Sequence, residues 1–347
     1  MQPRGTGDPR PFLSVCIVTG RRIPLLDACL ASLQQQVDPP TFEVLVCSDG
    51  DEDVAAAVHA RFADASVCQV DRALPGAGRN LLVDEARGSL LLFLDDDVTV
   101  RADMLRRLAD LAAAHPEIGA FGGPNDSPAD STRFQFVQGA VMASIVGAGP
   151  VRRRYGVHPA GPADERFFIL CNLAVRREVM LPFDTELVCA EENALLHELR
   201  RESVPMHFDP SLVVFHERRA TVVGFGRQMH KYGRGRGQLM VRRPSTVQPA
   251  FLAPSALLVY LVLAIVLAVT VSPLALLPLA AYLLAVAAGA VAIAATLRRP
   301  TTLPVAAALI VELHVCYGTG VVRGLTERTR PVPLPEVRAW VRAPEGP

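Results

Sequence analysis

Short apolar runs alternate with helical patterns through the first hundred residues of the chain. The runs are rich in β-branched and aliphatic side chains and lack the polar alternation of strands that face water. They comprise Phe12–Thr19, Phe42–Cys47, Val67–Val70 and Ser89–Leu94. Helical spacing follows Pro24, covers residues 53–63 and continues from Arg79 to residue 86. Because parallel strands covered on both faces read as unbroken apolar runs, the pattern predicts an α/β fold with a mostly parallel, Rossmann-like sheet.

Beyond residue 120 the pattern is less regular. Two further strands are predicted at Phe167–Val175 and Ser211–Phe215, and a helix at Glu191–Arg201. A basic, glycine-rich stretch at residues 227–236, which contains YGRGRG, is interpreted as a loop. Such a loop suits phosphate groups or anionic lipid headgroups, and both interpretations stay open.

The C-terminal third is predicted to be a membrane region. Residues 251–271 and 274–297 are almost free of charge, and each is long enough to cross a bilayer. Arginine pairs at 242–243 and 298–299 flank this hairpin, which favours both flanks in the cytoplasm. A third stretch, 303–322, carries two polar side chains near its middle; we favour a third span or half-span over a re-entrant or interfacial element. The chain is therefore divided at 1–245, 246–325 and 326–347.

Composition changes this picture little. The formal net charge is zero, which predicts no nucleic-acid partner. Seven scattered cysteines without a CxxC pair argue against a disulfide framework and favour a reducing compartment. The polar N-terminus lacks the apolar core of a signal peptide. We therefore expect a multi-pass protein of the inner (cytoplasmic) membrane, with the domain at 1–245 facing the cytoplasm.

Three consecutive carboxylates, Asp95, Asp96 and Asp97, follow the fourth apolar run. Adjacent carboxylates repel one another unless a cation lies among them, and hard divalent ions prefer oxygen ligands. Ligands bind at the carboxyl ends of the strands in parallel sheets, where Asp49 also falls. The pattern predicts a metal site, with a solvated turn as the alternative.

Several blocks resemble family 2 glycosyltransferases, which have the nucleotide-diphospho-sugar transferase fold known as GT-A. GAGRNLLVDEARGSLLLFLDDDV is similar to the central signature of that family, and SVCIVT and VLVCSDGDED are similar to its first two strands. The block from CNLAVRREV to VVFHE resembles its acceptor-side region. The resemblance covers residues 12–218 and makes the domain at 1–245 the expected catalytic domain.

The resemblance implies a role for individual residues. Thr19, Asp49 and Asp95 match positions that contact the nucleoside part of the donor. Arg79 and Asn80 are expected at a helix start, where N–H groups and arginine suit a diphosphate; an ordinary helix start is the alternative.

Metal ligands and a general base are also implied. Asp97, with Asp95 and His216, would hold Mg²⁺ or Mn²⁺, and a structural strand-end histidine is the alternative for His216. Glu191 and Glu192 match an acidic pair whose second member takes the proton of an acceptor hydroxyl. We favour Glu192, although two carboxylates at a helix start also complement the helix dipole.

The implied function is inverting transfer of a sugar from a UDP- or GDP-linked donor to a saccharide acceptor at the membrane, expected to be lipid-linked. The YGRGRG run is similar to that of membrane-anchored, succinoglycan-type exopolysaccharide glycosyltransferases, and the Gln-x-x-Arg-Trp motif of processive enzymes is missing. Two alternatives remain: a sugar nucleotidyltransferase, which Gly20-Arg21-Arg22 weakly favours, and a catalytically degenerate membrane scaffold.

Overall fold

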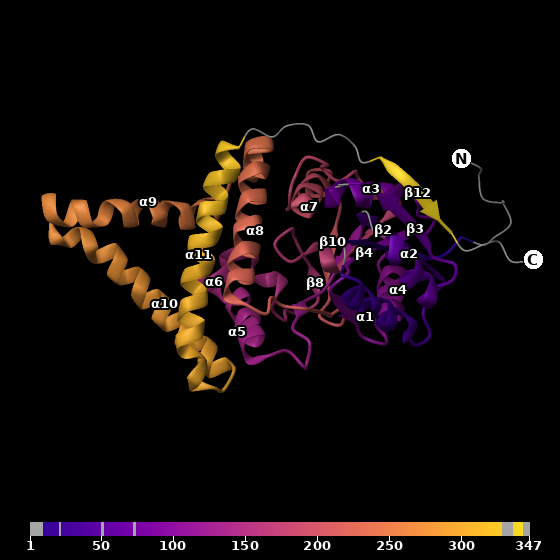
Figure 1. Ribbon diagram of the computed structural model, residues 1–347, viewed down its shortest axis with the longest axis horizontal. Coiled ribbons are helices and arrows are strands. Elements are labelled where there is room, and N and C mark those ends of the chain that lie inside the picture. The colour runs from indigo at the N-terminus through magenta and orange to yellow at the C-terminus, as the bar shows by residue number, and fades with distance from the viewer. Residues whose placement is uncertain (1–9, 21, 50–51, 72–73, 328–335, 343–347) are drawn as a thin grey trace, which may run out of the picture.

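The computed structural model describes residues 10–20, 22–49, 52–71, 74–327 and 336–342. A sheet domain lies at one end of the molecule, and a helical hairpin extends from the other (Figure 1). The main sheet has the strand order β12-β3-β2-β1-β4-β9-β6-β10-β8. Its strands are β1 (Leu13–Thr19), β2 (Phe42–Asp49), β3 (Ser66–Val70), β4 (Leu90–Asp95), β6 (Ala120–Gly122), β8 (Gly161–Pro162), β9 (Leu173–Arg176), β10 (Met206–Phe208) and β12 (Val337–Val341).

The first four strands form a parallel block, as their apolar runs predict. β1 lies between β2 and β4, and β3 continues the block on the outer side of β2. The later strands differ, because β9 pairs antiparallel with both β4 and β6. The sheet is therefore parallel from β3 to β4, where β1, β2 and β4 end at Thr19, Asp49 and Asp95, and mixed beyond β4.

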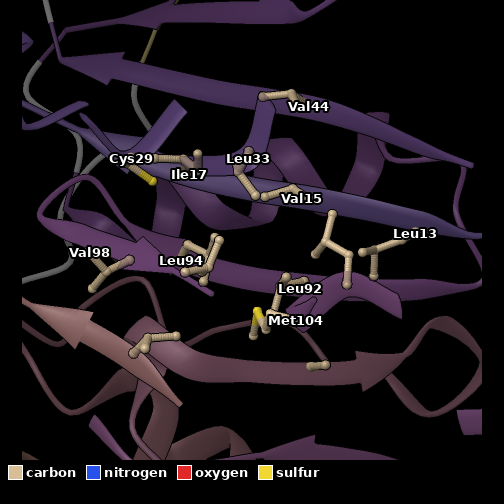
Figure 2. Packing of buried hydrophobic residues seen from close by; sticks show 14 of the residues in the cluster. Leu13, Val15, Ile17, Cys29, Leu33, Val44, Leu92, Leu94, Val98 and Met104 are labelled. Carbon is tan, nitrogen blue, oxygen red and sulfur yellow. The ribbon is translucent and has the colours of Figure 1, made fainter. Parts of the chain in front are cut away.

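Helices cover both faces of the sheet, which explains the unbroken apolar runs. Helices α1 (Ile23–Gln34), α2 (Glu52–Arg61) and α4 (Met104–Ala114) pack on one face, and α3 (Pro75–Glu85) and α7 (Glu191–Arg201) pack on the other. Alternate side chains of β1 point to opposite cores: Val15 and Ile17 join the α1 side, whereas Cys16 joins the α3 side. Figure 2 shows the α1-side core.

Helix α3 starts earlier than predicted. It begins at Pro75, so the glycine-rich segment after Leu74 is its first turn and not a loop. A Cβ at Gly76 would lie 2.7 Å from the carbonyl oxygen of Asp184, and one at Gly78 would lie 3.0 Å from Cys47 Sγ. These glycines allow the helix to pack closely, and proline at the first helical turn is well tolerated.

A second, three-stranded sheet consists of β5 (Val98–Val100), β11 (Val214–His216) and β7 (Asn125–Asp126). β11 pairs antiparallel with β5, with His216 opposite Val98. The backbone N–H of Glu217 donates to the carbonyl oxygen of Asp97 at 2.9 Å. This small sheet brings the end of β11 to the aspartates after β4. The predicted strand 167–175 is correct only in its last three residues, because a 3₁₀ turn (Leu170–Asn172) precedes β9.

The basic stretch at 227–236 is helical, so its interpretation as a loop is wrong. It lies inside α8 (Val222–Arg242), whose N-cap Thr221 side chain accepts a hydrogen bond from the backbone N–H of Gly224. α8 packs along α11 (Leu303–Thr326) through glycines on both helices. A Cβ at Gly233 would lie 2.1 Å from the carbonyl oxygen of Tyr317. The glycines therefore serve close helix packing, as small residues four apart do in membrane proteins.

The predicted hairpin is present as α9 (Pro249–Thr270) and α10 (Leu277–Thr296), joined by a 3₁₀ turn (Pro273–Leu276). Both helices extend away from the sheet domain, and α11 lies beside α8 across their base (Figure 1). Side chains such as Val262 and Val269 are 77% and 82% exposed, which an aqueous environment would not favour. By length and composition, α9, α10 and α11 are each able to span a membrane. The short helices α5 (Arg133–Met142) and α6 (Ile145–Ala148) pack against this region.

The C-terminal tail returns to the sheet domain. After α11, strand β12 pairs antiparallel with β3 at the edge of the main sheet, with Trp340 opposite Cys68. The segment 337–341 is therefore a part of the sheet and packs with the domain at 1–245.

Candidate active site

A large cavity opens at the carboxyl ends of β1, β2 and β4. Its volume is about 1040 Å³, and Thr19, Asp49 and Asp95 line it at the strand ends. Glu191 and Glu192 line it from the start of α7. The same cavity extends to side chains of α9, α10 and α11: Phe251, Pro254, Leu257, Tyr282, Leu313 and Tyr317. It therefore joins the predicted site to the apolar hairpin.

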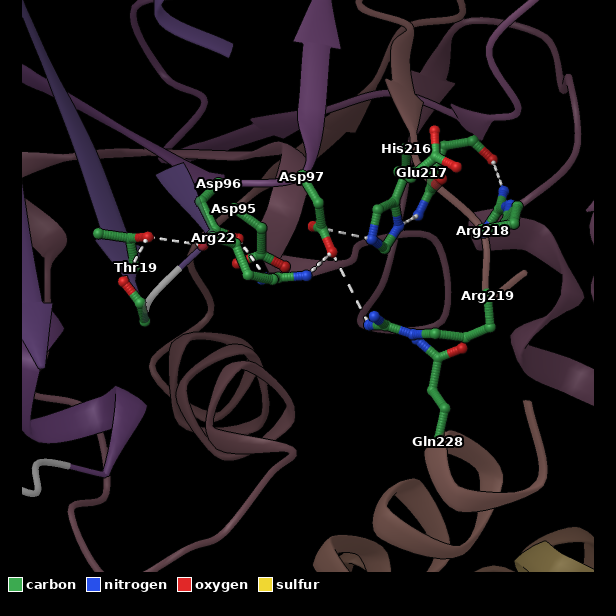
Figure 3. A network of polar contacts seen from close by, with 12 residues as sticks. Thr19, Arg22, Asp95, Asp96, Asp97, His216, Glu217, Arg218, Arg219 and Gln228 are labelled. Atoms are coloured by element: carbon green, nitrogen blue, oxygen red, sulfur yellow. Dashed lines mark hydrogen bonds and ion pairs between the residues drawn. The ribbon is translucent and has the colours of Figure 1, made fainter. Parts of the chain in front are cut away.

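The three aspartates have three different environments. Asp95 is only partly buried and accepts a hydrogen bond from Arg79. Asp96 is buried and accepts one from Thr19 Oγ1 at 2.7 Å and another from Arg22. Burial raises the pKa of Asp96, and the hydrogen bonds from Thr19 and Arg22 oppose this. Asp96 is thus held by the protein itself, and its contacts fix the turn that presents Asp97 (Figure 3).

Asp97 and His216 face each other as two adjacent ligands would. Asp97 Oδ1 lies 3.1 Å from His216 Nε2, and both side chains are buried. Two ligands bound to one ion at about 2.1 Å, at right angles, are separated by roughly 3.0 Å. Oxygen and imidazole nitrogen together suit a first-row divalent ion such as Mn²⁺ better than Mg²⁺. Among the described residues no three His, Cys, Asp or Glu side chains form a complete metal cluster, so other ligands would come from donor phosphates and water.

Asn125 is a partner of His216 that no sequence motif indicated. Its amide Nδ2 lies 3.1 Å from His216 Nδ1 and 3.4 Å from Cys171 Sγ, while its Oδ1 is buried without a partner. The assignment of amide O and N follows from hydrogen bonding, so the group can rotate by 180°. In that orientation Oδ1 accepts from a protonated Nδ1, and Nε2 of His216 is then free to bind a metal.

We expect Asn125→Leu to weaken Mn²⁺ binding by about 10- to 100-fold, the usual cost of losing such an outer partner. Manganese electron paramagnetic resonance on the purified chain measures the affinity directly. Asn80→Leu is a control for loss of a hydrogen-bonded, half-buried amide elsewhere, and it should leave Mn²⁺ affinity unchanged. Equal Mn²⁺ affinity in Asn125→Leu and the wild type would show that His216 needs no such partner.

Two arginines lie beside Asp97 and offset its negative charge. Arg22 Nη1 lies 2.5 Å from Asp97 Oδ2, and Arg219 Nη2 lies 3.8 Å from the same oxygen. Burial disfavours the charge of Asp97, but His216 and Arg22 outweigh it and hold the pKa below its usual range. Arg22 belongs to the Gly20-Arg21-Arg22 segment, whose Arg21 lies outside the described residues. The guanidinium group of Arg22 lies beside the aspartates, where it could contact a phosphate as well as a carboxylate.

Arg79 connects the end of β4 to the start of α7 across the cavity. Its Nη1 donates to Glu191 Oε1 at 2.6 Å and its Nη2 donates to Asp95 Oδ1 at 3.0 Å. Burial opposes its charge, but Glu191 and Asp95 keep the pKa of Arg79 above its ordinary value. Burial also raises the pKa of Glu191, against the attraction of Arg79. Removing one partner of such a buried ion pair typically lowers the free energy of unfolding by about 3–5 kcal/mol. We therefore interpret the pair of Glu191 and Arg79 as structural.

Glu192 has a different set of partners. Its Oε1 accepts from Asn193 Nδ2 at 2.6 Å and lies 3.3 Å from Nη1 of Arg154. Its side chain lines the cavity and is 10% exposed. Because Glu191 is engaged by Arg79, Glu192 is the member of the pair better placed to take a proton from a bound hydroxyl.

The remaining predicted residues, Thr19, Asp49 and Asn80, have different positions in the structure. Thr19 lines the cavity, but its hydroxyl donates to Asp96. Asp49 lines the cavity at the end of β2. Asn80 lies in the second turn of α3, and its amide binds both backbone groups of Phe183, at 2.8 and 3.0 Å. The expectation that Arg79 and Asn80 start a helix is therefore wrong, because Pro75 starts it four residues earlier.

Comparisons with known proteins agree with this geometry. Residues 14–180 match the family model described as Glycosyl transferase family 2. No curated protein sequence matches the chain significantly. Among solved structures, the chain is similar to the mannosyltransferase PcManGT from Pyrobaculum calidifontis in complex with GDP-Man and Mn²⁺. The two are 18% identical over 91% of this chain and 88% of that chain, with a TM-score of 0.57. It is also similar to S. aureus TarS, at 15% identity over 66% of this chain and 39% of that chain, with a TM-score of 0.43.

The family match and the shared architecture account for the strands, the Asp95–Asp97 turn and the helices around them. The match ends before Glu191 and His216, whose positions come from the structure alone. The chain therefore has the GT-A fold, with residues 14–180 matching the glycosyl transferase family 2 model, followed by helices long and apolar enough to span a membrane.

Proposed function

We propose that this protein is an inverting glycosyltransferase that moves a sugar from a nucleotide-diphospho-sugar to an acceptor hydroxyl at a membrane. The observation that carries the proposal is the cavity that joins Asp95, the Asp97 partner His216, Glu192 and the apolar hairpin. A catalytically degenerate scaffold is disfavoured because the carboxylates that the reaction needs, Asp95, Asp97 and Glu192, are all present. A sugar nucleotidyltransferase is disfavoured because Arg22 binds the aspartates and Glu192 lies on the acceptor side.

Asp97 and His216 would hold the divalent ion, and Arg22 and Arg219 would contact the donor diphosphate beside it. A bound Mn²⁺ or Mg²⁺ would act as a Lewis acid that stabilises the departing nucleoside diphosphate. The similar mannosyltransferase was solved with GDP-Man and Mn²⁺, which supports a UDP- or GDP-linked donor and a divalent ion here. Thr19, Asp49 and Asp95 would surround the nucleoside at the strand ends.

Glu192 would accept the proton of the attacking hydroxyl on the other side of the anomeric carbon. Attack from that side, opposite the diphosphate, inverts the anomeric configuration. Since apolar side chains of α9, α10 and α11 line the same cavity, we propose a lipid-linked saccharide as the acceptor, in cell-surface or exopolysaccharide synthesis.

The test is nucleotide binding followed by a donor screen on the full-length chain in detergent. Isothermal titration with GDP and with UDP, each with and without Mn²⁺, should show binding that requires the ion. Transfer or hydrolysis of labelled nucleotide sugars should then stop on addition of EDTA. Absence of binding to every nucleoside diphosphate would contradict the proposal and favour the scaffold.

The arrangement of the tail bears on membrane topology. α8 leaves the sheet domain, and β12 returns to the same sheet after α11. Because α8 and β12 both contact the sheet domain, they lie on the same side of the membrane. The chain between them must then cross the membrane an even number of times. We therefore propose that α9 and α10 cross the inner membrane and that the catalytic domain faces the cytoplasm. In place of the third span or half-span favoured from the sequence, we propose that α11 lies along the cytoplasmic surface. The burial of the helices supports this placement of α11. The share of the most apolar stretch that is buried within the protein rises from 11% in α9 to 39% in α11.

Single cysteines test this topology in intact cells. We expect Ser272→Cys, in the hairpin turn, to react with a membrane-impermeant maleimide added outside. Thr326→Cys, at the end of α11, should react only after lysis, and the wild-type chain reports the background from its own seven cysteines. Labelling of Thr326→Cys from outside would show that α11 crosses.

A further inference from the structure

Two buried arginines lie between Glu192 and the membrane hairpin. Arg154 ends the 3₁₀ turn Gly149–Arg154, and Arg236 lies on α8. Their exposed fractions are 7% and 9%, and both line the cavity. Both donate to one acceptor, Asn193 Oδ1, Arg236 through Nη2 at 2.9 Å. The two guanidinium groups are thus held together by a single neutral amide.

Their charges are poorly compensated by the protein. Arg154 lies 3.3 Å from Glu192, and its Nε is buried without a hydrogen-bond partner. Arg236 has neutral partners among the described residues: Asn193, the hydroxyl of Tyr317, and the ring of Phe251, whose centroid lies 4.1 Å from its Cζ. Burial accordingly lowers the pKa of Arg236.

Nearby acids do not supply the missing charge. Glu165 contributes only its backbone carbonyl to Arg154, at 3.0 Å, and its carboxylate lies 3.6 Å from Arg200. Among the described residues, Glu192 is therefore the one carboxylate near both cations. Buried charge of this kind is costly unless an anion completes the site.

The position of the pair suggests what the anion is attached to. Phe251, which stacks on Arg236, is the third residue of α9, and Pro254 and Leu257 line the cavity one and two turns further along that helix. A group bound at the arginines could thus extend an apolar chain along α9. Guanidinium forks match phosphate oxygens in geometry as well as charge.

We propose that Arg154 and Arg236 bind the phosphate of a polyisoprenoid-linked acceptor and so place the attached acceptor group beside Glu192. This inference rests on the proposed function and names its acceptor class. Arg154 and Arg236 belong to segments far apart in the sequence. Arg154 was not a candidate from the sequence, whereas Arg236 ends the basic stretch 227–236 that suggested phosphate groups or anionic lipid headgroups. Their common ligand Asn193 follows Glu192 directly, which couples the phosphate site to the proposed base.

Farnesyl phosphate is a soluble probe for this site. Its affinity for the full-length chain in detergent can be measured by thermophoresis, with farnesol and inorganic phosphate as the two half-ligands. We expect Arg236→Gln and Arg154→Gln to weaken farnesyl phosphate binding by about 10- to 100-fold each, with Arg236→Lys intermediate. Arg106→Gln, on the surface of α4, is the matched control and should bind as the wild type does. Thermal melting checks that each variant is folded.

The outcomes separate the sources of the anion. Unchanged farnesyl phosphate affinity in folded Arg236→Gln and Arg154→Gln would overturn the assignment. Inorganic phosphate that binds as tightly as farnesyl phosphate, and is lost in the same variants, would overturn the lipid and leave a free-phosphate site. Wild-type chain that binds GDP or UDP with Mn²⁺ but not farnesyl phosphate would overturn this inference alone. Binding of farnesyl phosphate without any nucleotide would instead contradict the proposed function.

Discussion

Asp97→Ala is expected to lower sugar transfer on the order of 10³-fold, the range seen when a group that stabilises developing charge is removed. The substitution removes one of the two proposed metal ligands and leaves His216 beside Arg22 and Arg219. Two cationic side chains at the site would then further disfavour a divalent ion. Mn²⁺ binding and nucleotide binding should fall together with transfer.

Transfer rates with a labelled donor measure the first effect, and manganese electron paramagnetic resonance measures the second. Asp110→Ala is the control, because this aspartate lies on α4 with an exposed side chain. Asp97→Ala that retains both full transfer and full Mn²⁺ affinity would contradict the proposed site.

Glu192→Gln should slow transfer by about 10²- to 10⁴-fold, the usual contribution of a positioned general base. The amide retains the size of the side chain and its contact with Asn193 but cannot take a proton. Donor binding should be unchanged, since we place Glu192 on the acceptor side of the cavity. A separate measurement of nucleotide affinity therefore distinguishes a lost base from a lost binding site.

Glu191→Gln provides the comparison that assigns the base. It leaves Arg79 with Asp95 as its remaining carboxylate contact, and we expect a lower melting temperature as the main effect. If Glu191→Gln melts like the wild type but loses transfer, and Glu192→Gln retains it, the roles of the two glutamates are reversed.

Much of the sheet domain was predictable because local pattern and tertiary environment agree. Both faces of β1 and β4 are buried, so unbroken apolar runs identified them. The helix Glu191–Arg201 was predicted with its observed bounds. Helix starts were less predictable: glycines at 76 and 78 looked like a loop, but they allow α3 to approach β2 and the segment at residues 183–184.

The partners of the site were harder to predict, because they depend on contacts between distant segments. Asn125 reaches His216 through the three-stranded sheet, whose strands β7 and β5 are two and three residues long. Such short strands have no periodic pattern. Arg154 lies in the irregular region 121–165, and Arg236 lies in a stretch whose glycines suggested a loop until their packing on α11 was known.

The return of β12 to β3 has a consequence for the order in which the protein matures. Strands β1 to β4 leave the ribosome first, yet the strand that covers their outer edge is translated only after the hairpin. Until then β3 presents unpaired backbone groups, a surface that invites pairing with other chains. The edge of β3 is therefore covered only after α9, α10 and α11 have been translated, so the main sheet is completed last.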